Sequence, residues 1–113
     1  FYVTSETGDS ARIYPMKVWE EIEAKLSRLS SHNRTKQKFL TKTNYYGQAV
    51  EIDAQGRILI PPVLREVALM KGDVDVNGNL TYLEVWNHAR SLENLKKSQL
   101  TDDDWKTLDD LGI

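Results

Sequence analysis

Cysteine is absent from the 113 residues of this chain. The absence excludes a disulfide framework and a thiolate zinc site, and it is compatible with a reducing compartment. No apolar stretch approaches the length of a membrane span, so the sequence predicts no membrane partner. Only three prolines occur, and each stands where the pattern of one element gives way to another.

Catalytic signatures are missing as well. The two histidines, His32 and His88, lie far apart and belong to no motif. No serine stands in a nucleophile motif, and no glycine-rich loop suits phosphate binding. The run from Asp102 to Asp104 lacks the ligand spacing of a calcium loop. We therefore expect no enzyme, no cofactor and no metal.

The composition indicates one small folded domain, with 40% apolar residues and three tryptophans. The net charge of −2 is unevenly distributed, because residues 101–113 hold five aspartates and one lysine, a net −4, which leaves +2 for the remainder. Residues 26–46 hold five arginines or lysines and no acid. Local charge, not the total, decides where a polyanion docks.

The first part of the chain predicts a hairpin followed by two helices. Strands are expected at 1–4 and 11–14, and a helix from Pro15 to about residue 29. Its apolar side chains recur at three- and four-residue steps and should pack on the hairpin: Trp19, Ile22, Leu26 and Leu29. The second helix should run from 34 to about 44, capped by Ser31 or Asn33, with Phe39 and Leu40 inward.

A basic stripe follows one side of this second helix. Arg34, Lys38 and Lys42 are four residues apart and therefore lie on the same face. A stripe of this kind serves either as a solvated face or as a surface for DNA. The sequence favours the solvated face.

The second part predicts two hairpins and more helices. Strands around Val50–Ile52 and 58–60 flank a turn at 53–57, and a short helix covers 63–69, with Gly72 as its cap. Strands at 73–76 and 80–86 surround an Asn77-Gly78 turn. A helix follows at 87–97. A capping box at Thr101 begins a short terminal helix whose acids serve the helix dipole and solubility.

One motif carries a family resemblance. Asp53-x-x-Gly56-Arg57-x-x-x-Pro61, with Leu64-Arg65 behind it, resembles the looped hinge of AbrB-type swapped-hairpin proteins and is most similar to the MraZ family. The resemblance implies an α+β fold, a swapped-hairpin (AbrB/MraZ-like) β-barrel with flanking helices. It also implies a ring-shaped homo-oligomer that binds repeated promoter elements in double-stranded DNA and regulates the bacterial division and cell-wall gene cluster. Such a protein is cytoplasmic and nucleoid-associated.

The chain also contains an internal repeat. Ile13-Tyr14-Pro15 and its helix correspond to Val85-Trp86-Asn87 and its helix, at a shift of 72 residues. The family is similar in having two fused half-units, each with its own turn motif. We therefore expect residues 1–45 to be the remainder of a first half-unit that lacks its turn motif. Residues 46–97 would form the second half-unit, and 98–113 an acidic C-terminal helix or tail. The absent motif is expected as a separate peptide partner, a disordered segment or a natural deletion.

Within the motif, Arg57 resembles the DNA-contacting arginine of the family. Arginine grips phosphate or reads guanine edges, whereas a purely structural role would be an ion pair with Asp53 that stiffens the turn. Gln55 at the turn tip either adds a hydrogen bond to DNA or is only a polar turn residue. Gly56 and Pro61 are expected to be structural. Arg65 should face solvent or pair with an acid.

The resemblance thus predicts a sequence-specific DNA-binding transcriptional regulator. Two alternatives come from other classes. One is an antitoxin-like DNA-binding module whose tail contacts a protein partner, and the other is an assembly fragment that lacks DNA binding. A short, capped tail argues against the first, and retained DNA binding would exclude the second.

Overall fold

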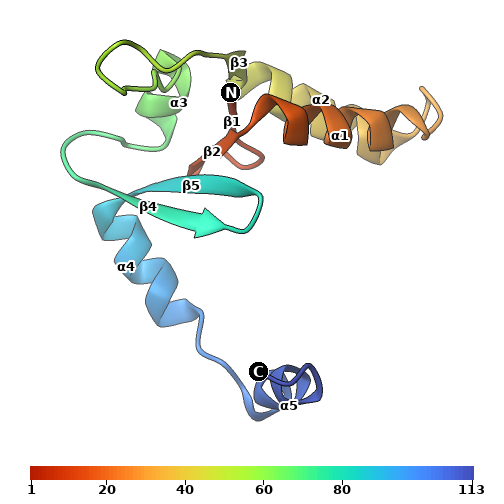
Figure 1. Ribbon diagram of the computed structural model, residues 1–113, viewed down its shortest axis with the longest axis vertical. Helices are drawn as coiled ribbons and strands as arrows, with labels where there is room; N and C mark the ends of the chain where they lie inside the picture. The colour runs from red at the N-terminus through yellow and green to blue at the C-terminus, as the bar shows by residue number, and fades with distance from the viewer.

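The computed structural model describes all residues from 1 to 113, which form an α+β fold (Figure 1). The elements in chain order are β1 (Tyr2–Thr4), β2 (Ala11–Tyr14), α1 (Met16–Ser27), α2 (Arg34–Tyr46), β3 (Gln48–Ala49), α3 (Pro62–Val67), β4 (Val74–Asn79), β5 (Tyr82–Asn87), α4 (His88–Lys97) and α5 (Asp102–Asp110). No helix is both long and apolar enough to cross a membrane.

The five strands form one antiparallel sheet in the order β3-β1-β2-β5-β4. Two hairpins lie side by side and are joined through their second strands, with Ala11 opposite Val85 and Ile13 opposite Leu83. The α+β class is confirmed. The sheet itself is not closed, because β3 and β4 remain as its two edges. A barrel would need further strands at these edges.

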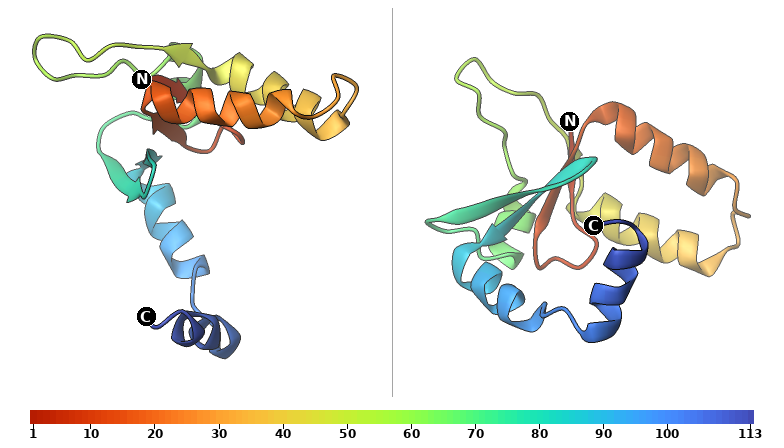
Figure 2. Two further views of the ribbon diagram at one scale, coloured as in Figure 1. Left: turned by 45° about the vertical axis from the view of Figure 1, so that its right-hand side comes forward. Right: turned by 60° about the horizontal axis from the view of Figure 1, so that its bottom comes forward.

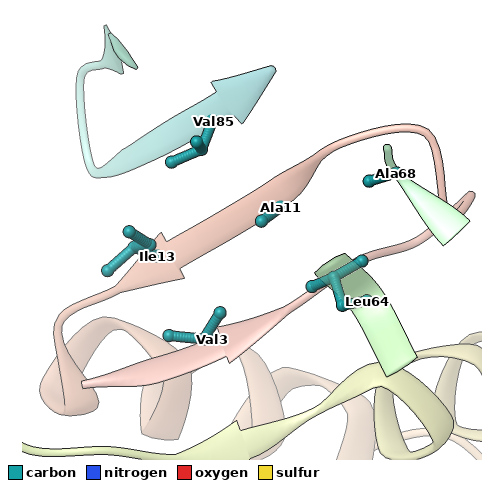
Figure 3. Close-up of a cluster of buried hydrophobic side chains, with 6 residues drawn as sticks. All are labelled: Val3, Ala11, Ile13, Leu64, Ala68 and Val85. Carbon is teal, nitrogen blue, oxygen red and sulfur yellow. The ribbon is translucent and has the colours of Figure 1, made fainter. Parts of the chain in front are cut away.

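One face of the sheet is apolar and is partly covered by α3. Residues directly opposite on antiparallel strands share a face, so Val3, Ile13 and Leu83 point the same way. The core cluster combines this face with Leu64 of α3 and with Ala68, the C-cap residue of that helix: Val3, Ala11, Ile13, Val85, Leu64 and Ala68 (Figure 3). Leu64 and Ala68 are fully buried. The apolar core is small, so each of these side chains contributes a large share of it.

The opposite face is aromatic and is covered by α1. The Trp19 ring is 4% exposed, and its centroid lies 4.5 Å from that of Tyr2 and 5.2 Å from that of Tyr14. The predicted packing of Trp19 on the first hairpin is therefore confirmed. Ile22 and Leu26 are only half-buried, and Leu29 is exposed. The predicted apolar face is wrong for its C-terminal part, because α1 runs out past the sheet beside α2 (Figure 2).

The second helix is bound to β1 through one backbone carbonyl. Thr43 O accepts hydrogen bonds from the hydroxyls of Thr4, at 2.7 Å, and Tyr2, at 3.2 Å. Asn33 is the N-cap, with its side chain accepting from Lys36 N, whereas Ser31 does not cap. Gly47 ends the helix at this junction, and a Cβ there would overlap the Thr43 carbonyl and the Tyr2 hydroxyl. Glycine is therefore required at position 47, where the end of α2 lies against β1.

A charged contact bridges the two hairpins on the aromatic face. Arg12 lies opposite Glu84 in the register, and its Nε is 3.7 Å from a Glu84 carboxylate oxygen. The guanidinium also contacts Glu6 at 2.9 Å and lies 4.8 Å from the centre of the Tyr82 ring. A cross-strand pair of opposite charge helps to specify which strands neighbour each other.

The predicted position of the second hairpin turn is wrong. The ladder extends from Val74–Asn87 to Asn79–Tyr82, so the turn is at Leu80-Thr81 and not at Asn77-Gly78. Leu80 adopts φ +60°, a conformation that favours glycine. A turn at Asn77-Gly78 would leave Val76 unable to face Val85, the neighbour of Ala11 on β2. The long ladder and its packing thus override the local turn preference.

Two further predictions around the central motif are wrong. Residues 50–52 and 58–60 form no strands, and only Gln48–Ala49 pairs with β1. Gly72 does not cap α3, because the helix ends earlier, at Val67. Leu69, at φ +54°, takes the left-handed position there, and Met70 N donates to Arg65 O in a Schellman arrangement.

The C-terminal helices begin as predicted. The Asn87 side chain accepts from Arg90 N at the start of α4. Thr101 and Asp104 form the predicted capping box of α5. Figure 1 shows α5 at the end of a short connection, away from the sheet. The acidic residues Asp102 to Asp110 thus lie on a helix.

Candidate nucleic-acid interface

The loop between β3 and α3 is organised by the carboxylate of Asp53. Its Oδ1 accepts hydrogen bonds from the backbone N–H groups of Gln55 and Arg57, both at 2.9 Å. Asp53 N donates to Arg57 O at 2.9 Å, and Gly56 N donates to Asp53 O at 3.0 Å. One side chain therefore satisfies the backbone of the turn, as Asx turns do.

Gly56 has the conformation that the motif predicts. Its φ is +77°, and a Cβ at this position would meet no atom within 4 Å. A larger residue would fit in space but would strain the backbone. Glycine is therefore required here for its backbone freedom.

Arg57 is held at one nitrogen and free at the others. Its Nε donates to Asp53 Oδ2 at 3.0 Å, and the side chain is 71% exposed. Neither Nη atom has a hydrogen-bond partner in the chain. The predicted ion pair is confirmed, and it leaves the end of the guanidinium available for a bidentate contact.

The turn also shifts the ionisation of Asp53. The backbone hydrogen bond from Arg57 N, followed by the one from its side chain, lowers the pKa of the Asp53 carboxyl. Because the pKa of Asp53 is lower in the folded protein, its contacts stabilise the fold at pH values above the ordinary carboxylate pKa. This stabilisation is lost as the pH falls through the pKa of Asp53 in the folded state. The ion pair that orients Arg57 is therefore intact at neutral pH.

The loop projects from the body of the molecule and is fastened at its base. Figure 2 shows it extending beyond the sheet between β3 and α3. Gln55 is exposed, and its side chain makes no hydrogen bond. Pro61 is buried and is the N-cap residue of α3, so it positions this helix and does not end a strand. Leu64 and Ala68 then anchor α3 in the core.

Sequence reasoning missed three neighbours of this loop. Glu51, Ile58 and Leu59 line a shallow hollow together with Asp53 and Arg57. Their only signal in the sequence is their proximity to the motif. Arg65, in contrast, is exposed and makes no ion pair. Of the two predicted alternatives for Arg65, a solvent-facing side chain and a pairing with an acid, the structure has the first. The charged side chains of this hollow are Glu51, Asp53 and Arg57, so Arg57 is its one cation.

A His–Asp pair lies outside this loop, on β4 and α4. No cluster of three or more His, Cys, Asp or Glu side chains has the geometry of a metal site. His88 Nδ1 lies 2.9 Å from an Asp75 carboxylate oxygen, and this hydrogen bond raises the pKa of His88. The pair joins β4 to the first residue of α4.

The segment that contains the 53–57 loop matches a known protein family. The family described as "MraZ protein, putative antitoxin-like" matches residues 47–109, which include the Asp53–Arg57 loop, α3 and the second hairpin. The chain belongs to the MraZ family. Its relatives include the transcriptional regulator MraZ of Koribacter versatilis strain Ellin345, 53% identical over 113 residues, which are all of this chain and 77% of the relative.

The similarity extends to other members of the MraZ family. The transcriptional regulator MraZ of Acidobacterium capsulatum is 46% identical across the whole chain and 77% of its own length. That of Thiobacillus denitrificans is 35% identical over 88 residues, which are 78% of this chain and 60% of the relative. These MraZ relatives are named as regulators of transcription, a class distinct from enzymes.

Proposed function

We propose that this MraZ-family chain binds double-stranded DNA sequence-specifically and thereby regulates transcription. The loop of residues 53–57 would be the base-reading element, with Arg57 as its principal contact and Gln55 as a second one. The names of the relatives support regulation of transcription. In line with the family resemblance, the target would be repeated promoter elements of the division and cell-wall gene cluster, and the protein would act in the cytoplasm at the nucleoid.

The geometry of Arg57 is the main support for this proposal. A flexible arginine loses side-chain entropy when it binds, and the Nε–Asp53 contact at 3.0 Å has already restricted this one. The two Nη atoms make no hydrogen bond within the chain, and the side chain is 71% exposed. Such a fork matches the O6 and N7 atoms of guanine or two oxygens of a phosphate.

We expect Arg57→Ala to weaken DNA binding without unfolding the protein. Loss of a bidentate guanine contact should reduce discrimination by about 1–3 kcal/mol per contacted base pair. Loss of a phosphate contact should instead weaken binding to all sequences and reduce the salt slope by about one unit per engaged arginine. The measurement is a salt titration on a duplex selected from a random pool by the native protein, beside a scrambled duplex.

Arg65→Ala is the matched control, because Arg65 is also an exposed arginine, eight positions further along, but makes no ion pair. It should retain both the affinity and the discrimination of the native chain. A thermal melt of each variant separates binding from folding. If Arg57→Ala binds both duplexes as the native protein does at every salt concentration, Arg57 is not part of the interface.

The same proposal includes assembly of several copies. The apolar sheet face continues past α3 onto β4 and β5, where Val74 and Val76 of β4 and Leu83 of β5 share the side of buried Val85 yet are exposed. Both sheet edges are also unpaired. Exposed edges and apolar patches favour association. Strands from further chains would complete the swapped-hairpin barrel, with half-units at 1–45 and 46–97, and a ring would present many loops to successive repeats.

We expect the isolated chain to exceed its monomer mass of 13.0 kDa in solution. Light scattering over a range of concentrations measures this directly. Val76→Lys, which charges the uncovered face where Val76 is 58% exposed, should lower the mass. Thr81→Lys at the tip of the same hairpin adds the same charge outside that face and should not. A native chain that stays monomeric with a cooperative melt would refute assembly.

A further inference from the structure

The outer face of α2 carries cations that nothing in the chain uses. We call this surface the α2 basic face and define it by Arg34, Gln37, Lys38, Thr41 and Lys42, which are all exposed and together line an open hollow. The buried side of the same helix is formed by Thr43 and, in part, Phe39. The helix α2 therefore has one packed side and one exposed side that carries Arg34, Lys38 and Lys42.

The cations of the α2 basic face lack acidic partners. None of Arg34, Lys38 and Lys42 belongs to any of the ion pairs of the structure. The sequence contains no Asp or Glu from residue 24 to residue 50. An ordinary solvated helix face mixes both signs, because opposite charges at i and i+4 stabilise it and like charges destabilise it. Three successive like charges at this spacing therefore have a cost that folding alone does not explain.

The spacing of these groups suits a polyanion with regular charges. At about 1.5 Å per residue, Arg34 and Lys42 are roughly 12 Å apart along the helix. One strand of duplex DNA carries a phosphate about every 3.4 Å of its axis, so this face spans about three phosphates. Gln37 and Thr41 lie between the cations, but their side chains already donate to Ser31 O and Gln37 O, so a contact with phosphate rests on the three cations.

We propose that the α2 basic face is a second DNA-binding site that grips the phosphate backbone without reading sequence. This inference rests on the proposed DNA-binding function and adds a contact to it. Figure 1 shows α2 and the 53–57 loop leading into and out of β3. The longest extent of the molecule is 41 Å, little more than one turn of duplex. The loop selects the site, and the α2 basic face adds affinity that is independent of sequence.

The test replaces the three cations together with neutral residues of similar helix propensity: Arg34→Gln, Lys38→Gln and Lys42→Gln. We expect affinity for a scrambled 30-base-pair duplex to fall and the slope of log K against log salt to drop by up to about 2.7 units. The ratio of affinities for the selected and the scrambled duplex should stay unchanged. A control with Lys96→Gln, Lys97→Gln and Lys106→Gln removes the same charge from α4 and α5, and its slope should stay near the native value.

Two results would overturn the inference alone. One is a triple variant with the salt slope of the control while Arg57→Ala still loses discrimination. The other is an unchanged slope with a lower assembly mass, which would assign the face to a protein partner such as the acidic α5 of a second copy. If the native protein binds neither duplex even at low salt, both this inference and the proposed function fail.

Discussion

Trp19→Ala is expected to lower the free energy of unfolding by about 3–5 kcal/mol, the range for removal of a buried large aromatic ring. The Trp19 ring is 4% exposed and lies between Tyr2, Tyr14 and Phe39, with ring centroids 4.5, 5.2 and 6.3 Å away. These three partners come from β1, β2 and α2. The substitution therefore leaves a cavity where three elements meet, and small domains have little stability to lose.

Trp105→Ala provides the matched control for this result. Trp105 is 54% exposed on α5, so its removal deletes the same atoms without a comparable cavity. Urea or thermal unfolding of both variants measures the difference, with a change below about 1 kcal/mol expected for the control. Equal stability of Trp19→Ala and the native chain would mean that α1 is not packed on the sheet.

Leu64→Ala is expected to cost about 2–5 kcal/mol and to release the candidate interface at the same time. Leu64 is fully buried against the apolar sheet face, and with Ala68 it is what anchors α3 in the core. The 53–57 loop ends at this helix through buried Pro61. Loss of the anchor should therefore raise hydrogen exchange in residues 53–68 and reduce DNA affinity more than the Arg57 contact alone explains.

Val63→Ala tests the same helix without touching its anchor. Val63 precedes Leu64 and is 42% exposed, so its truncation should change stability by less than about 1 kcal/mol. Exchange in the loop should remain as in the native chain. If both variants loosen the loop equally, α3 does not position it through Leu64.

Elements with strong local signals could be predicted from the sequence. The first hairpin, α2, α4 and α5 are present, and Asn33, Asn87 and Thr101 cap their helices as expected. These features depend on side chains within a few residues of each other, which is why pattern and capping chemistry suffice for them. The same holds for the Asp53–Arg57 turn, since its Asx bonds and the positive φ of Gly56 are local.

The tertiary structure alone decided features that depend on distant partners. The second hairpin turns at Leu80-Thr81, because β5 must match β2 on one side and β4 on the other. The flanks of the 53–57 loop form no strands, because this chain offers them no partner for a ladder. The fold also decides which cations lack an acidic partner, as those on α2 do, because the positions of all the acidic side chains must be known first. Sequence thus determined the local turns, caps and helices of this protein. The register of the strands, the segments that form strands and the charges that lack a partner could be known only from the tertiary structure. Each of them depends on residues that are far apart in the chain.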